Sequence, residues 1–204
     1  MAFGTYSELT TAIGAYMVKT YTSTETDYFI ALAESVMNRH LSGQYRRSGL
    51  STITTDSTGT ATLPTGFIML RSIVRDVTGS LPLTQVSWSA LSLLDPYAVS
   101  SDATHYAIQG SSIKVAPVTE DDFTAIYDSS VPNLSSTTTT NWLLTLAPDI
   151  YLEMCLAEAE RYEMNPGAAD AHKFNGLTEL DNLVAQSNVA QFGNAELVLD
   201  MVTP

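Results

Sequence analysis

The sequence predicts an α+β fold, mainly a four-helix bundle with a β-rich module inserted between its second and third helices and an extended C-terminal arm. Apolar residues recur at helical spacing before residue 43 and after residue 141, whereas β-branched and turn residues dominate between them. The last residues carry an apolar run with no helical partner. We therefore expect three parts: a helical bundle domain (1–43 and 141–189), an inserted β-rich module (44–140) and an arm (190–204).

The first two helices are expected over residues 5–19 and 25–41. Thr5 and Glu8 match a capping box at the start of the first helix, and Thr24 is the expected cap of the second. The apolar stripe of the second helix consists of Phe29, Leu32, Ala33, Val36, Met37 and Leu41. Three polar residues are placed off this stripe: Glu34, Asn38 and Arg39.

The β-rich module is predicted from short apolar runs separated by turn residues. Runs at 51–55 and 60–63 flank a turn at 56–59, which is a hairpin signal. A strand at 69–77 is expected to pair with 81–86. The remaining elements are a short helix at 87–95, a hairpin formed by 106–109 and 112–116, and a strand at 123–129.

The segment 141–164 is the most hydrophobic long stretch and is expected to form the central helix. Pro148 and Asp149 suit a first helical turn, because Pro has no N–H to leave unpaired and Asp opposes the positive end of the helix dipole. Apolar residues then point to several sides, which predicts packing on several sides. A last helix is expected over 166–187, after Asn165.

The charge balance separates classes of function. Acids outnumber bases 22 to 9, which gives a net charge of −13. Residues 141–204 hold only Arg161 and Lys173 against ten acids. Nucleic-acid binding needs Lys and Arg to displace counterions, so the composition argues against it. The same asymmetry is also explained by solubility alone.

Other sequence features argue against a secreted or membrane-spanning protein. Cys155 is the single cysteine, so no intrachain disulfide is expected, and its apolar neighbours predict a buried, inert thiol. No apolar run approaches the length of a membrane span, and the N-terminal residues lack the basic and apolar regions of a signal peptide.

Catalytic signatures are missing from the sequence, with no nucleotide-binding, nucleophile-elbow or zinc motif. We predict no catalytic, cofactor or metal site and no enzymatic activity. The densest acidic run, residues 120–122, is interpreted as a solvated loop in preference to a cation site. Glu153 with Glu158 or Glu160 is interpreted as an exposed helix face in preference to a catalytic carboxylate pair.

The C-terminal arm carries the candidate partner interface. A run such as LVLDMV cannot bury itself in an already closed bundle, and an exposed apolar run invites association. We expect it to add to a neighbour as a strand or clamped arm. The interface residues are Phe192, Leu197, Val198, Leu199, Met201 and Val202.

Five segments in order resemble the head-to-tail adaptor (connector) family of tailed bacteriophages. They are TYSELTTAI (5–13), YFIALAESVMNRHL (28–41), TATLPTGFIMLRSI (60–73), HYAIQGSSIKVAP (105–117) and VPNLSSTTTTNWLLTLAPDIYLEMCLAEA (131–159). The resemblance implies a virion structural protein, assembled in the host cytoplasm. It also implies a homo-oligomeric ring, commonly a dodecamer, that binds the portal above and a tail or nozzle protein below, with no cofactor and no membrane.

The resemblance also implies that double-stranded DNA passes through the ring without sticking, which would give the negative charge a purpose. Glu153, Glu160 and Glu163 are the candidate channel-facing acids, because they share the polar side of the central helix. The arm is expected to grip the portal or an adjacent adaptor. The alternatives are another tail-completion or minor tail protein, and a carboxylate-dependent hydrolase acting on cell-surface sugar.

Overall fold

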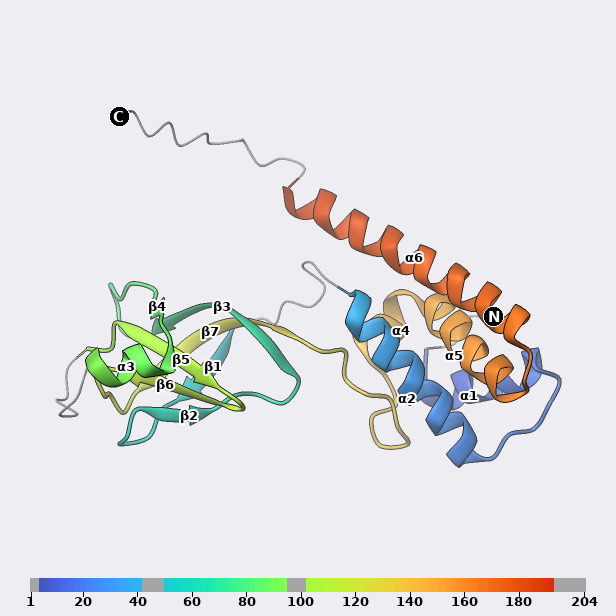
Figure 1. The fold of residues 1–204 in the computed structure, drawn as a ribbon, viewed down its shortest axis with the longest axis horizontal. Coiled ribbons are helices and arrows are strands. Elements are labelled where there is room, and N and C mark those ends of the chain that lie inside the picture. Colours follow the sequence, from blue (N-terminus) through green and yellow to red (C-terminus); the bar gives the residue numbers. More distant parts are fainter. Residues whose placement is uncertain (1–3, 42–49, 95–101, 193–204) are drawn as a thin grey trace. The chain divides into compact units, whose positions relative to one another are not determined.

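The structure, a computed structural model, describes residues 4–41, 50–94 and 102–192, which form six helices and two small sheets. The chain divides into two compact units (Figure 1). Residues 1–46 and 131–204 form a helical unit, and residues 47–130 form a β unit. The predicted α+β class, with a β-rich module between helices, is confirmed.

Helix α1 (Tyr6–Tyr16) begins at the predicted capping box, in which the Glu8 N–H donates to Thr5 Oγ1 at 3.3 Å. The helix ends before the predicted residue 19 because Val18 adopts a positive φ of 51° and reverses the chain. The Lys19 N–H then donates to the Gly14 carbonyl at 3.0 Å. A Cβ on Gly14 would lie 2.9 Å from the Lys19 carbonyl oxygen, so the missing side chain makes room for this turn.

Helix α2 (Ser23–His40) starts two residues earlier than predicted, and the expected cap at Thr24 is wrong. Thr22 caps the helix through a reciprocal pair of hydrogen bonds with Glu25. The Thr22 N–H donates to Glu25 Oε2 at 2.7 Å, and the Glu25 N–H donates to Thr22 Oγ1 at 3.3 Å. This pairing satisfies two backbone N–H groups at once, which favours Thr22 over Thr24.

The predicted central helix is two helices, α4 (Trp142–Leu146) and α5 (Pro148–Tyr162), which meet at Ala147. Ala147 takes a non-helical conformation because the ring of a following proline disfavours the α region. Pro148 opens α5, as predicted. Helix α5 packs against α1, α2, α4 and α6, which confirms its central place in the helical unit.

Helix α6 (Pro166–Phe192) continues past the predicted end at residue 187, so residues 190–192 of the predicted arm are helical. The rest of the arm, 193–204, lies outside the described residues. α6 lies close against α5 at Gly176, where an added Cβ would be 2.8 Å from Met154 Sδ. The core of the helical unit contains residues from α1, α2, α4, α5, α6 and the segment 131–134.

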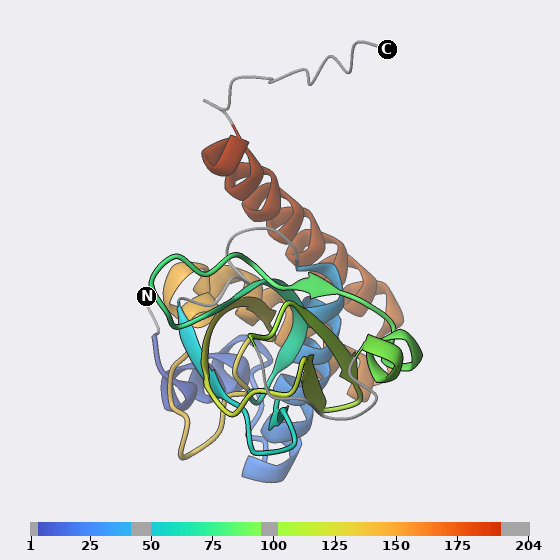
Figure 2. The same cartoon turned by 90° about the vertical axis from the view of Figure 1, so that its left-hand side faces the viewer.

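The β unit contains two sheets (Figure 2). Buried residues from both sheets form one apolar core. One has the strand order β1 (Ser51–Thr54), β7 (Asp122–Ser129), β3 (Phe67–Arg75). The other has the order β2 (Thr60–Thr62), β6 (Ser112–Ala116), β5 (His105–Gln109), β4 (Thr84–Gln85). Helix α3 (Trp88–Leu94) packs on β5 and β6.

One predicted strand pairing is wrong, and a second forms only in part. The turn at 56–59 forms, but β1 pairs with β7 while β2 pairs with β6, so the two strands enter different sheets. The segment 81–86 meets β3 at one isolated bridge, Val74 with Pro82, and β4 instead pairs in parallel with β5. Pro82 has no N–H to donate, whereas β7 offers β3 a partner of matching length. The β5–β6 hairpin and β7 are confirmed.

Candidate functional site

A buried polar network fastens the segment 131–141, where the chain returns from the β unit, to α2 and α5. Glu34 of α2 is only 3% exposed, and its Oε1 accepts the Leu134 N–H at 2.8 Å and the Tyr151 hydroxyl at 3.0 Å. Asn141 Nδ2 donates to Tyr151 Oη at 2.6 Å and to the Pro132 carbonyl at 2.8 Å. Burial raises the pKa of the Glu34 carboxyl above its ordinary value.

The prediction that Glu34 lies off the buried stripe of α2 is therefore wrong. Leu32, which was predicted to be on that stripe, is 53% exposed. Glu34 follows Ile30 by four residues and precedes Met37 by three, so it shares the buried side of α2 with them. Asn38 also faces this seam and accepts the Val131 N–H at 2.9 Å.

A second polar cluster joins the ends of α1 and α5 to the start of α2. Lys19 pairs with Glu163, and the Tyr21 hydroxyl donates to the same carboxylate at 3.3 Å. The Tyr162 hydroxyl donates to Glu25 at 2.9 Å. Burial, with Glu163 beside it, raises the pKa of Tyr21 to about 12. These contacts tie three helix ends together at the polar end of α5.

The three candidate channel acids have different partners. Glu153 is hydrogen-bonded to His172 Nδ1 of α6 at 2.9 Å. Glu160 accepts a bond from Asn165 Nδ2 at 2.9 Å, and Glu163 pairs with Lys19. Glu163 is therefore paired with a cation, whereas the partner of Glu160 is a neutral amide.

Glu153 and Glu158, considered above as a possible catalytic carboxylate pair, have different partners. Glu158 is buried, so the predicted exposed helix face is wrong at this residue, and its carboxylate accepts two bonds from Arg161 Nη1, both at 3.0 Å. Glu153 is instead turned towards His172 of α6. The Glu153–His172 contact joins α5 to α6, whereas the Glu158–Arg161 pair lies within α5.

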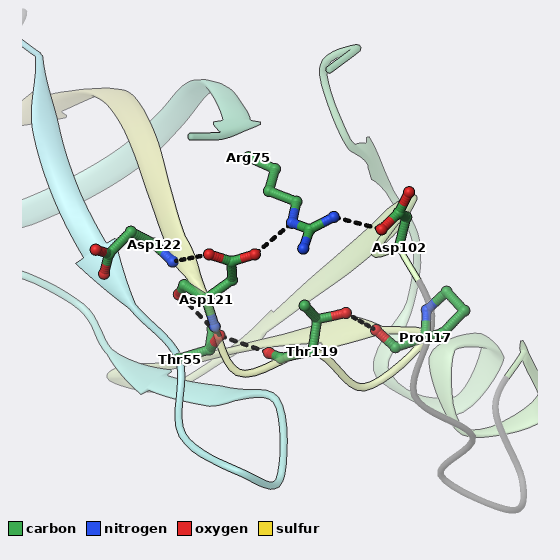
Figure 3. A network of polar contacts seen from close by, with 7 residues as sticks. All are labelled: Thr55, Arg75, Asp102, Pro117, Thr119, Asp121 and Asp122. Carbon is green, nitrogen blue, oxygen red and sulfur yellow. Dashed lines mark hydrogen bonds and ion pairs between the residues drawn. The ribbon is translucent and has the colours of Figure 1, made fainter. Parts of the chain in front are cut away.

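The acidic run at 120–122 forms part of a polar network that fixes its loop (Figure 3). Arg75 pairs with both Asp121 and Asp102, and the Asp122 N–H donates to Asp121 Oδ1 at 2.9 Å. The hydrogen bond from Arg75 holds the pKa of Asp121 below its ordinary value. Thr55 Oγ1 donates to the Thr119 carbonyl at 2.7 Å. The loop was expected to be solvated, and Glu120 is indeed exposed. Asp121 is instead held by Arg75 and by the Asp122 N–H.

The described residues contain no group of three or more His, Cys, Asp or Glu side chains arranged to hold a metal ion. Cys155 is fully buried, as predicted, and burial raises the pKa of its thiol. Among the helices described, none combines the length and the hydrophobicity needed to cross a bilayer.

The predicted arm interface falls largely outside the described part of the chain. Phe192 is the last residue of α6. The five apolar residues that follow it in the predicted interface, Leu197, Val198, Leu199, Met201 and Val202, belong to 193–204. Their role stays a prediction.

No curated protein matches the chain. The family model of the SU10 adaptor protein matches residues 4–195, which is nearly the whole sequence and includes both units. This match agrees with the resemblance carried by the five ordered segments. The chain therefore belongs to the SU10 adaptor protein family of phage head-to-tail adaptors, which are structural proteins.

Proposed function

We propose that this chain assembles as a ring of twelve copies between the portal and the tail or nozzle protein, and that the ring lines the passage through which DNA leaves the head. The family match over residues 4–195 is the observation that carries the proposal. The proposed role is structural, without catalysis, cofactor or membrane contact. The ring belongs to the virion and assembles in the host cytoplasm.

The proposed division of labour follows the two units. Helices α1, α2, α5 and α6 form the bundle that makes the ring and portal contacts. The β unit has its own core, so it can meet tail components without disturbing that bundle. Residues 193–204 grip the portal or an adjacent adaptor.

The net charge of −13 supports the DNA passage. A wall of like charge repels phosphate, and there are too few bases to release many counterions. Among the three candidate acids, Glu160 contributes more than Glu163, since Lys19 offsets Glu163 and the partner of Glu160 is a neutral amide.

Mixing the purified protein with isolated portal rings tests the proposal. We expect a complex whose mass corresponds to twelve copies on one portal ring, measured by native mass spectrometry. Deleting 193–204 should leave the melting temperature of the helical unit unchanged and abolish stable attachment. A protein that binds isolated tail components but not the portal is a tail-completion or minor tail protein instead.

DNA binding gives an independent test. The protein should not retard a linear duplex at physiological salt, either free or on the portal. Glu160→Lys should increase DNA retention by the assembled ring, whereas Glu120→Lys on the exposed loop of the β unit serves as the charge-matched control. Tight duplex binding by the unaltered protein would contradict the proposed slippery passage.

A further inference from the structure

Helix α6 has apolar residues on two opposite sides. One side packs into the helical unit through Ala169, Gly176 and Leu180, which are all buried. The other side exposes Phe174, whose 70% exposure leaves most of an aromatic ring in contact with water. A helix with apolar residues on both sides is expected to be covered on both sides. Since the described residues of this chain leave Phe174 exposed, we expect another surface to cover it.

A groove of about 210 Å³ lies between α2 and α5. Its walls include Tyr28 and Leu32, one turn apart on α2, and Tyr162 on α5, and all three are exposed. Phe29 forms its buried floor and contacts the Tyr162 ring edge-on, with centroids 5.5 Å apart. An aromatic side chain entering this groove would meet the aromatic and aliphatic surface of these four residues.

The groove is also held in shape before any partner arrives. The Tyr162 hydroxyl donates to Glu25 at 2.9 Å, and Glu25 is itself fixed by the capping box at the start of α2. Because the Tyr162 side chain is already held in one rotamer, it loses little side-chain entropy when a partner covers it. The site is thus preorganised for an aromatic anchor.

Each of the two surfaces carries charges of both signs. Asp170 lies one turn before Phe174 on α6, and Lys173 precedes it directly. The charged residues that line the groove are Glu25, Glu158 and the half-exposed Arg161, whose Nη1 is bound to Glu158. Asp170 can therefore face Arg161, and Lys173 can face Glu25, when Phe174 enters the groove.

We infer that Phe174 of one copy inserts into the α2–α5 groove of the next copy. The inference rests on the proposed ring and names its contact. Because the two surfaces are different parts of the same chain, the contact is head-to-tail, and such a contact generates a closed ring when the rotation between copies closes. Each copy then offers one anchor and one groove.

Site-directed cross-linking tests the pairing. Cys155 is fully buried, so introduced surface cysteines are the reactive ones. Phe174→Cys mixed with an affinity-tagged Leu32→Cys should give a dimer of one tagged and one untagged chain with a short bismaleimide reagent. The experiment is run on concentrated free protein and on portal-bound protein. Tyr16→Cys, at another exposed aromatic position, replaces Phe174→Cys as the control and should give no such product.

Two outcomes would overturn the inference. One is the absence of the mixed dimer in both preparations. The other is efficient cross-linking of Phe174→Cys to itself, which would mean that like surfaces meet. Portal binding by the unaltered protein tests the proposed function separately. A normal portal complex without the mixed dimer therefore rejects the contact and leaves the function standing.

Charge substitution supplies a second test that does not depend on cysteine reactivity. Phe174→Glu and Leu32→Glu should each raise the concentration needed for ring assembly roughly tenfold or more, as expected for loss of a buried aromatic anchor. Each variant keeps one intact surface, so the 1:1 mixture should form a dimer that cannot extend. Tyr16→Glu is the matched control and should assemble normally. Rings formed normally by Phe174→Glu with an unchanged melting temperature would reject the contact.

Discussion

Two residues at helix ends adopt a backbone conformation that favours glycine. Val18 after α1 has φ of 51° and Met164 after α5 has φ of 60°, and their side chains are 92% and 88% exposed. In each case the next N–H closes the turn, from Lys19 to the Gly14 carbonyl and from Asn165 to the Glu160 carbonyl. Neither side chain gains the burial that would offset a left-handed backbone.

Replacing Val18 with glycine should therefore stabilise the protein. The strain of valine in the left-handed conformation is larger than the extra conformational entropy that glycine loses on folding. We therefore expect a gain of about 0.5–1 kcal/mol in the free energy of unfolding. Urea denaturation measures this gain. Val18→Ala, which keeps a Cβ, should gain much less, and equal effects of the two substitutions would contradict the explanation by strain.

Glu34 should make folding depend on pH in a direction opposite to that of most acids. Because burial raises its pKa in the folded state, its stabilising contribution is full below the ordinary value of 4.5 and is lost as the pH rises through the folded-state value. Glu34→Gln keeps an oxygen for Leu134 and Tyr151 but cannot titrate. The free energy of unfolding of the unaltered protein, minus that of Glu34→Gln, should fall as the pH rises.

Glu8 provides the control of opposite sign. A hydrogen bond from the Gly4 N–H lowers the pKa of Glu8, so its contribution is present above the ordinary pKa and is lost as the pH falls. The corresponding difference curve for Glu8→Gln should rise with pH. Parallel curves for Glu8→Gln and Glu34→Gln would show that the Glu34 environment is not the one described.

The contrast between these two glutamates shows what the sequence could predict at this scale. The partners of Glu8 lie within four residues, so the capping box was readable from the sequence. The segment that covers Glu34 reaches it from 100 residues away. The helical period alone could not choose which of Leu32 and Glu34 would be buried, and this choice left the α2–α5 groove unrecognised.

At the scale of elements, two glycines in α6 have opposite surroundings. Gly167 has no atom within 4 Å of an added Cβ, whereas at Gly176 that Cβ would lie 2.8 Å from Met154 Sδ and 3.3 Å from Glu153 Cβ. The helix propensity of alanine favours both substitutions by up to about 1 kcal/mol. Only at Gly176 does packing against α5 oppose it.

Gly176→Ala should therefore be less stable than Gly167→Ala by roughly 1–3 kcal/mol, the usual effect of overfilling a packed contact. Thermal and urea unfolding of the two variants measure the difference. The comparison removes the general effect of alanine in a helix and leaves the α5–α6 contact. Equal stabilities would mean that Met154 moves aside without cost.

The strands show the same division between local and distant information. The turns at 56–59 and 110–111 have local hydrogen bonds or a positive-φ glycine and were predicted correctly. The partner of β1 is β7, with Thr54 opposite Asp122, far along the chain. Proximity in sequence predicts that adjacent strands pair with each other. This prediction fails where a turn carries the chain from one sheet to the other.

At the scale of the whole molecule, each unit has a separate apolar core. The helical core contains Leu41, before the chain leaves for the β unit, and Val131, where it returns. The Val131 N–H donates to Asn38 Oδ1 at 2.9 Å, so the exit and return points are neighbours within the helical unit. Residues of the β core all lie between Ile53 and Tyr127.

Replacing residues 47–130 with a short Gly/Ser linker should therefore leave the helical unit folded. Leu41 and Val131 belong to the same core, so residues 42–46 followed by a linker of about eight residues, which reaches up to roughly 25 Å when extended, are ample to connect them. Circular dichroism should show a helical protein with one cooperative thermal transition, and Phe174→Cys with Leu32→Cys should still form the mixed dimer. A shortened chain that is unfolded would show that the helices depend on the β unit. A shortened chain that folds but loses the mixed dimer would place part of the contact between copies in the β unit.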